Sequence, residues 1–359
     1  SQANRMEEAL QRAVDDGRIE IPVVEVDFTG LVGEGDDKLQ YEVGKISSLQ
    51  APHRLSDAIL RDSEHDGVPF RESKLGEKID GASMQNATPL YELGPHALVF
   101  GLWDSTGPRG GLGAKFERAI VSEIVGIDCP YLFDGSEGFL PRRLGLRRDP
   151  LNVSRHSAVR KTGERGWENV EIDDDSGKKL PKDAIRPSKI NHGNIPFGAK
   201  NSQNPDSQDD INAGVTIDHA EQTTTLSLIA LRRLQFPDGN GNVDRERNHA
   251  AQTVLTALGL CGAALAADEG LDLRSRCLLW PEEPMQWELL AKPGEDPQSF
   301  SLDADAAVDL LKQAIEAAEK AGLKWQGRIP LKPSAELVKL VARSQELEAK
   351  HAGESEDTQ

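Results

Sequence analysis

The sequence has few cysteines, few aromatic residues and no uninterrupted apolar run of the roughly 20 residues that span a membrane. Its three cysteines, Cys129, Cys261 and Cys277, include no CxxC pair, which argues against a disulfide framework and against a cysteine-based zinc site. The first residues, SQANRMEEALQRAV, lack the apolar core of a signal peptide. We therefore expect a cytoplasmic protein without a membrane partner.

The overall charge is unlike that of most nucleic-acid-binding proteins, because the net charge is −18. The charges are, however, unevenly distributed. Residues 141–200 contain 14 Lys and Arg against eight Asp and Glu, a local charge of +6 that leaves −24 for the rest. A basic segment on an acidic body can hold one RNA strand locally, and the acidic remainder can meet basic partner subunits. Ordinary solvated surface is the alternative explanation.

The most informative stretch of the sequence is residues 96–126, HALVFGLWDSTGPRGGLGAKFERAIVSEIVG. Residues 96–103 are largely apolar and predict a strand. Residues 104–113 contain four glycines and one proline, which excludes regular secondary structure there. The following apolar residues have the spacing of an amphipathic helix that ends near Gly126: Phe116, Ala119, Ile120 and Ile124. We therefore expect a strand, a glycine-rich loop and a helix in direct succession.

A glycine-rich loop that leads into a helix presents backbone N–H groups to anions, phosphate above all. Arg109 in the loop, and Lys115 and Arg118 on the expected first helical turn, would complete a phosphodiester site. A simple connection between strand and helix is an equally good explanation. Two nucleotide motifs are excluded, because Phe116 stands where the P-loop needs Ser or Thr and where the dinucleotide fingerprint needs its third glycine. No cofactor is predicted, and a polymer backbone remains a candidate ligand.

The rest of the chain predicts helices and strands that alternate around long polar insertions. Helices are expected near residues 6–14, 245–267, 303–321 and 334–350, with Asp303 capping the third, and a strand near residues 19–28. Residues 61–81 are expected to form a mobile loop or an inserted finger. The segment between residues 140 and 214 is polar and basic and includes FLPRRLGLRR, with Arg142 and Arg143. This pattern favours an α+β fold with helices on one face of a sheet.

Three stretches together resemble a known family. They are residues 47–55, which end in Pro-His-Arg-Leu; residues 87–126, with ATPLYEL and FGLWDSTGPRGGLGAKFERAIVSEIVG; and residues 186–236, with RPSKINHGNIPFG and GVTIDHAEQTTTLSLIALRRLQF. The combination is similar to the backbone subunit, a member of the RAMP superfamily, of type I-G (formerly I-U) CRISPR Cascade surveillance complexes.

This resemblance implies a ferredoxin-like, RRM-related palm with finger and thumb insertions. In this chain the palm would comprise residues 1–140 and 214–330, with a finger near 61–86. Residues 141–213 would form a thumb-like basic insertion, and residues 331–359 a C-terminal helix and a disordered tail.

The resemblance also implies a non-catalytic role. Several copies would stack along one CRISPR RNA, together with other Cascade subunits, and present the spacer for pairing with target DNA in antiviral defence. The guide would be held by its backbone so that its bases stay free. The positions that match RNA-contacting segments of the family are His53, Arg54, Arg109, Gly110, Gly111, Gly113, Lys115, Arg118, Arg142, Arg143, Lys189, Asn191 and His192.

A RAMP-type endoribonuclease that cuts CRISPR RNA precursor or target RNA is the alternative. Asp104 and His53 would be its candidate catalytic residues, although an Asp in this context is more often a turn residue that bonds its own backbone. Residues 173–175 are three consecutive Asp, yet the lysines that follow favour a charged turn over a metal site. We therefore predict no catalytic residue and no metal.

Overall fold

The computed structural model describes residues 2–33, 35, 38–104, 114–128, 131–133, 139–141, 158–162, 166–170, 180, 182–185, 217–268, 270–274 and 277–356. The chain forms two compact units. Unit 1 comprises residues 1–123 and 222–346, and unit 2 comprises residues 124–221 and 347–359. The main hydrophobic core lies in unit 1.

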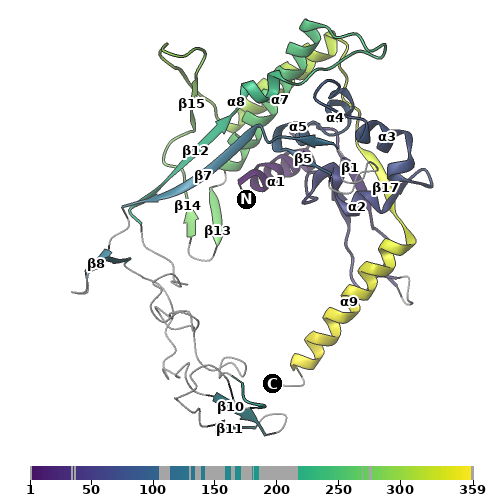
Figure 1. The fold of residues 1–359 in the computed structure, drawn as a ribbon, viewed down its shortest axis with the longest axis vertical. Helices are drawn as coiled ribbons and strands as arrows, with labels where there is room; N and C mark the ends of the chain where they lie inside the picture. The colour runs from purple at the N-terminus through teal and green to yellow at the C-terminus, as the bar shows by residue number, and fades with distance from the viewer. Residues whose placement is uncertain are drawn as a thin grey trace. The chain divides into compact units, whose positions relative to one another are not determined.

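Unit 1 is built on a five-stranded mixed sheet of order β2-β1-β17-β3-β4 (Figure 1). Its strands are β1 (Val24–Asp27), β2 (Lys45–Ser47), β3 (Ser63–His65), β4 (Val68–Pro69) and β17 (Ile329–Pro333). β1 is parallel to β17, with Val24 opposite Ile329, and the other neighbours are antiparallel. This mixture of helices and sheet confirms the α+β class. The strand order does not by itself identify a ferredoxin-like palm, which stays a prediction.

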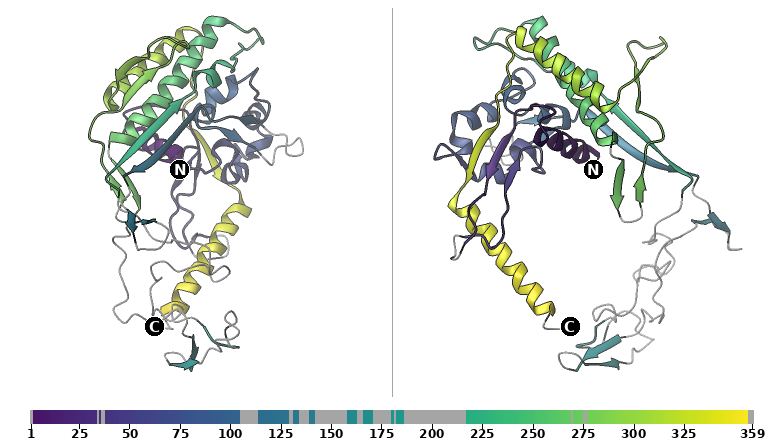
Figure 2. Two further views of the ribbon diagram at one scale, coloured as in Figure 1. Left: turned by 60° about the vertical axis from the view of Figure 1, so that its left-hand side comes forward. Right: turned by 180° about the vertical axis from the view of Figure 1, so that it is seen from behind.

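Four helices supply much of the core of unit 1. They are α1 (Gln2–Asp15), α5 (His96–Phe100), α7 (Arg245–Asp268) and α8 (Ala304–Lys320). α7 packs lengthwise against α8 and also contacts α1 and α5 (Figures 1 and 2). By length and composition alone α7 is long and apolar enough to cross a membrane, although its apolar residues do not form one uninterrupted run. The apolar window is 67% buried inside the protein, which favours a core helix.

The helices predicted near residues 6–14, 245–267, 303–321 and 334–350 are confirmed by α1, α7, α8 and α9 (Ala335–Glu356), of which α1 is longer than predicted. α8 begins as expected, because the Asp303 carboxylate accepts a hydrogen bond of 2.8 Å from the Ala306 N–H. The expected strand at residues 19–28 is present but shorter, as β1. α9 continues to Glu356, so the tail that was expected to be disordered is helical up to that residue.

Two stretches of unit 1 differ from the prediction. The expected loop at residues 61–81 contains β3, β4, the 3-10 helix η2 (Phe70–Glu72) and α3 (Lys74–Asp80), and it contributes two strands to the main sheet. The expected strand at residues 96–103 is instead α5 followed by the two residues of β5 (Leu102–Trp103). All five residues of α5 are buried. Its sequence therefore shows no alternation of apolar and polar residues by which a short helix could be distinguished from a strand.

The remaining elements of unit 1 are short. They are the 3-10 helix η1 (Arg54–Ser56), α2 (Ala58–Arg61), α4 (Thr88–Leu93), β6 (Lys115–Phe116), α6 (Leu228–Arg232), β13 (Leu271–Arg274), β14 (Cys277–Leu279), β15 (Gln286–Leu289) and β16 (Gln298–Ser301). β13 pairs with β14, and β15 pairs with β16, as antiparallel hairpins.

The helix expected from Ala114 to Gly126 is wrong, because β6 and the long strand β7 (Ile120–Ile127) occupy this stretch. Isoleucine and valine, which pack well on a pleated surface, make up five of the eight residues of β7, IVSEIVGI. β7 pairs with β12 (His219–Leu226). The Ser227 N–H donates to Ala119 O at 2.8 Å and the Asp218 N–H donates to Ile127 O at 3.0 Å, which makes the pair antiparallel.

The described part of unit 2 also contains β8 (Tyr131–Phe133), β9 (Phe139–Pro141), β10 (Ala158–Lys161) and β11 (Trp167–Val170). β10 pairs antiparallel with β11, and Val159 bonds Ile185 on its other side. Most of the predicted thumb-like segment lies outside the described residues.

Candidate nucleic-acid interface

The glycine-rich loop joins two strands. β5 and β6 pair antiparallel, with Leu102 opposite Phe116 and Trp103 opposite Lys115. The Asp104 N–H donates to Ala114 O at 3.1 Å and closes the ladder at its outer end. No helix begins at residue 114, so the predicted phosphate site at a helix N-terminus is wrong. The loop itself, with the candidates Arg109, Gly110, Gly111 and Gly113, lies outside the described residues.

The two faces of this hairpin differ sharply in exposure. Leu102 is 4% and Phe116 is 6% exposed, because both point into the core, whereas Trp103 is 65% exposed. Lys115 is also exposed, and its Nζ lies 5.6 Å from the centroid of the Trp103 ring. This distance is typical of a cation–π contact. The outer face of the hairpin therefore presents an aromatic ring and a cation side by side.

Arg118 follows the hairpin and is exposed, while its Nε donates to Phe100 O at 3.2 Å. The chain approaches closely here, since a Cβ on Gly101 would lie 3.3 Å from the Arg118 backbone nitrogen, and Gly101 has φ +89°. Arg118 also lines an open groove of about 500 Å³ with Gln2, Ala3, Ile120, Val121, Ser122, Glu123, Thr223 and Thr225. Arg118 and the four lining residues that carry a hydroxyl or amide group are suitable partners for a phosphate backbone: Gln2, Ser122, Thr223 and Thr225.

Arg54 occupies a different environment from its neighbour His53. Its Nε and Nη2 donate to the Glu7 carboxylate at 2.6 and 2.5 Å, and its Nη1 donates to Gly101 O at 3.1 Å. Only 7% of Arg54 is exposed, and its guanidinium lies 5.9 Å from the Phe100 ring centroid. These contacts favour a structural role for Arg54 over contact with a ligand. His53 is exposed, and its backbone N–H donates to Asp57 at 3.0 Å.

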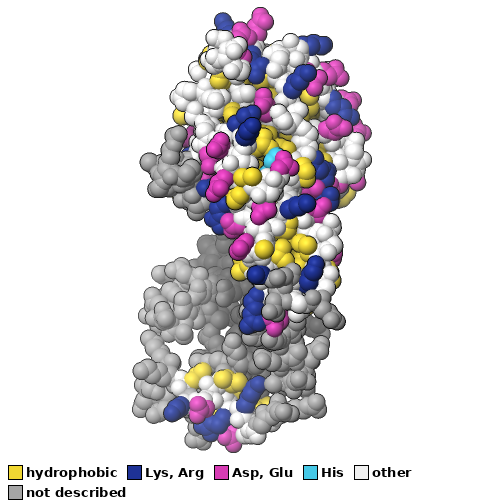
Figure 3. Space-filling view, turned by 90° about the vertical axis from the view of Figure 1, so that its right-hand side faces the viewer, with side chains coloured by type: hydrophobic (Ala, Val, Ile, Leu, Met, Phe, Trp, Pro, Cys, Tyr) yellow, Lys and Arg dark blue, Asp and Glu magenta, His cyan; other side chains and the backbone are white. Residues whose placement is uncertain are grey.

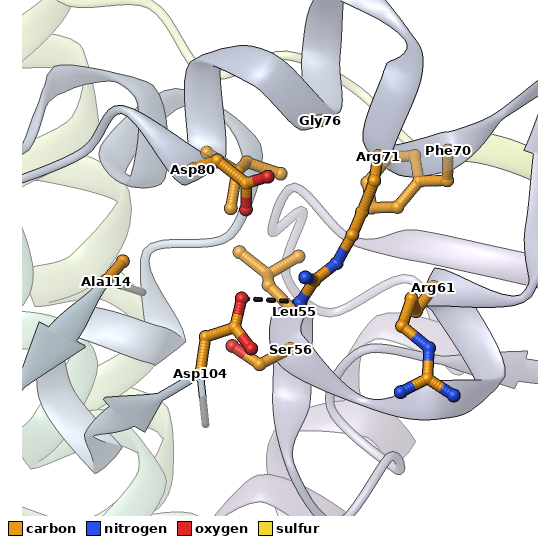
Figure 4. A pocket seen from close by; sticks show the side chains of 10 residues that line it. Leu55, Ser56, Arg61, Phe70, Arg71, Gly76, Asp80, Asp104 and Ala114 are labelled. Atoms are coloured by element: carbon orange, nitrogen blue, oxygen red, sulfur yellow. Dashed lines mark hydrogen bonds and ion pairs between the residues drawn. The ribbon is translucent and has the colours of Figure 1, made fainter. Parts of the chain in front are cut away.

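Asp104, the candidate nuclease residue, is ion-paired with Arg71 at the base of the loop (Figure 4). Asp104 is 4% exposed. Asp80 faces the pair, and burial raises the pKa of its carboxyl, an effect that Arg71 opposes and Asp104 reinforces. The adjoining cavity of about 10 Å³ has room for about one water molecule. The Arg71–Asp104 ion pair therefore connects the end of β5 to η2, and Asp80 at the end of α3 lies beside it.

The comparison with protein families gives one match. Residues 1–130 match the model of a family described as CRISPR-associated protein GSU0053. The matched segment runs from the first residues of α1 through the β5–β6 hairpin and all of β7. No curated protein matches the chain. The family match supports a CRISPR-associated protein with a role in CRISPR defence.

The predicted RNA-binding positions divide into two groups. Four lie within the described residues: Lys115 in the β5–β6 hairpin, Arg118 after it, Arg54 bonded to Gly101 before it, and His53 next to Arg54 in the chain. The other nine lie outside the described residues: Arg109, Gly110, Gly111, Gly113, Arg142, Arg143, Lys189, Asn191 and His192. Contact with RNA stays a prediction for every one of them. On the face of unit 1 shown in Figure 3, described basic and acidic side chains are interspersed.

Sequence reasoning missed Trp103 and Arg71. Trp103 was included in a strand expected to enter the core, so its exposure was not foreseen. If both ends of the loop had been taken as paired strands, the alternation of buried and exposed positions would have revealed this. Leu102 and Phe116 would then lie on the buried face, and Trp103 and Lys115 together on the exposed face. Arg71 lies 33 residues from Asp104 in the sequence, and no local pattern predicts their ion pair.

Proposed function

We propose that this chain is a CRISPR RNA-binding backbone subunit of a type I-G Cascade complex, built on a ferredoxin-like palm. Copies of the chain stack along the guide RNA, together with other Cascade subunits, and present the spacer to target DNA in the cytoplasm. The observation that carries this proposal is the family match over residues 1–130. It covers the hairpin whose outer face combines exposed Trp103 and Lys115, with exposed Arg118 after it.

The chemistry of the hairpin suits a polymer with a repeated phosphate. Lys115 and Arg118 are exposed cations that follow the loop, and neither is buried in a closed ion pair. A cation that contacts phosphate binds any sequence, which a guide with variable spacers requires. The cavity beside Asp104 is too small for a mononucleotide, so a bound polymer would lie over the outer surface of the hairpin.

The buried ion pair of Asp104 favours a non-catalytic subunit over the ribonuclease alternative. A carboxylate that acts on RNA must reach the scissile phosphate or a bound metal ion. The Asp104 carboxylate is bonded to Arg71 and almost fully removed from solvent. His53, the other candidate, is exposed, with its backbone bonded to Asp57. No group of three or more potential metal ligands lies within the described residues.

The first prediction concerns the two exposed cations. Lys115→Ala combined with Arg118→Ala should weaken binding of single-stranded RNA and flatten its salt dependence. The slope of log K against log salt should fall by about 0.7 for each lost phosphate contact. Filter binding of the full chain to CRISPR RNA over a series of salt concentrations measures both quantities.

The matched control is the double variant Lys312→Ala with Lys320→Ala. It removes the same charge at two exposed positions of α8. RNA that co-purifies with the wild-type chain should carry repeat-derived ends on mixed spacers when sequenced. Equal affinity and slope in both double variants would remove the hairpin cations from the interface. RNA cleavage that requires a divalent metal and is lost in Asp104→Asn would establish the ribonuclease instead.

A further inference from the structure

Trp103 is a large aromatic residue on the exposed face of the β5–β6 hairpin. The preceding residue in the same strand, Leu102, and its partner across the ladder, Phe116, are 4% and 6% exposed on the core side of the hairpin. Tryptophan has the largest apolar surface of any side chain, and most of that surface is usually covered. The 65% exposure of Trp103 therefore leaves a large aromatic face available to a ligand.

The backbone on both sides of Trp103 is held by hydrogen bonds and an ion pair. Two residues earlier, Gly101 O accepts a hydrogen bond of 3.1 Å from the buried Arg54 guanidinium. One residue later, Asp104 is ion-paired with Arg71 and donates its N–H to Ala114 O at 3.1 Å. A ring on such an anchored strand loses little conformational freedom when a ligand binds, which favours affinity.

A cation lies over this ring. The Lys115 Nζ is 5.6 Å from the Trp103 ring centroid, and the two residues are opposite each other in the ladder. The lysine stem is flexible and carries a compact ammonium group, so it can contact a phosphate while it stays next to the ring. A planar aromatic group joined to a phosphate within a few ångströms describes a nucleotide unit of a single strand.

We propose that Trp103 is a stacking platform for one base of the bound RNA, with Lys115 at the adjoining phosphate. This inference rests on the proposed function and adds a base contact to it. Every base has a flat face, so stacking tolerates any spacer sequence while it still requires that a base be present. Holding the guide would then depend on its bases as well as on its phosphates.

The test compares RNA with and without bases. The full chain is titrated by fluorescence anisotropy with a labelled uridine homopolymer and with an abasic ribose-phosphate strand of the same length. Wild type should bind the uridine strand about tenfold more tightly than the abasic strand, the range expected for one stacked base. Trp103→Leu should lose most of this preference, Trp103→Phe should keep part of it, and Lys115→Gln should lower the salt slope by about 0.7 on both strands.

The matched control is Trp280→Leu, which removes a tryptophan that is 69% exposed elsewhere in unit 1. It should keep the full preference for the uridine strand. Circular dichroism and thermal unfolding of every variant show whether the fold is retained. A folded Trp103→Leu variant with the wild-type preference would overturn the stacking platform and leave the proposed function intact. Wild-type protein that binds neither strand would overturn both, and a variant that changes only the sedimentation of the free chain would make Trp103 a contact between copies.

Discussion

Arg54 and Glu7 form an ion pair that is almost completely removed from solvent, with side chains 9% and 4% exposed. Burial raises the pKa of Glu7, and the Arg54 guanidinium opposes this increase. Removing one partner of such a pair leaves an uncompensated charge in the interior, which costs more than the pair itself contributes. The same arginine also ties α1 to the corner before β5, so it supports the hairpin indirectly.

Arg54→Met should therefore lower the free energy of unfolding by about 3 kcal/mol, because Glu7 is left buried without a partner. The double variant with Glu7→Met should recover most of this loss. Urea denaturation followed by circular dichroism measures both.

Arg12→Met is the control for the Arg54 variant, since it disrupts an exposed pair with Glu8 and should cost under about 1 kcal/mol. A folded Arg54→Met variant with normal stability and weakened RNA binding would contradict the structural role and support direct contact.

His96 is fully buried at the start of α5. Burial lowers the pKa of His96 to about 3, the charge of Arg54 adds to the decrease, and the Ser48 backbone opposes it. Between pH 6.5 and about 3 the unfolded chain binds a proton that the folded chain does not. The contribution of this residue to stability is therefore lost progressively as the pH falls through that window.

His96→Leu should remove this pH dependence. Between pH 6 and pH 4 the wild type should lose up to about 1.4 kcal/mol per pH unit more than the variant, the value for one proton. Urea denaturation at several pH values measures the difference. His249→Gln, at an exposed site on α7, should retain the wild-type slope. Parallel pH profiles for wild type and His96→Leu would mean that His96 is protonated in the folded protein.

Among the elements, the long helices were predictable and the short ones were not. α8 has a cap, a periodic apolar face and a glycine after its last turn, and each signal is local in the sequence. α5 and the strands around the loop have only five, two and two residues, and their apolar residues fit a helix or a strand equally well. Tertiary packing decides between them, through burial of all of α5 and through the β7–β12 pairing.

The cap of α8 offers a test at this scale. Asp303→Ala should lower the free energy of unfolding by about 1 kcal/mol, because the Ala306 N–H loses its acceptor at the helix N-terminus. Asp309→Ala removes the same charge from an exposed site within α8 and should change stability by under about 0.5 kcal/mol. Thermal unfolding of both variants compares them. An equal loss of stability in Asp303→Ala and Asp309→Ala would show that the lost charge, and not the lost cap, destabilises the protein.

For the whole molecule, the sequence predicted the α+β class, whereas RNA contact at the glycine-rich loop stays a prediction whose expected helix was wrong. The helix end that was to bind phosphate is absent, while Lys115 contacts an exposed aromatic residue, Trp103, that was missed. Residues that meet through the fold, such as Arg71 with Asp104 and Arg54 with Glu7, are separated by 33 and 47 positions. No single sequence without its three-dimensional contacts shows these pairs, which decide that Asp104 and Arg54 are buried.

The parallel pairing of β1 with β17 has a consequence for how the protein is made. Val24 is paired with Ile329, so β1 lacks one of its two neighbours in the main sheet until β17 has left the ribosome. At the usual rate of about 5–20 residues per second, synthesis of the roughly 300 intervening residues takes about 15–60 s. Throughout that time β1 has an open edge that can pair with another nascent chain. The main sheet of unit 1 can therefore be completed only after β17 has been synthesised.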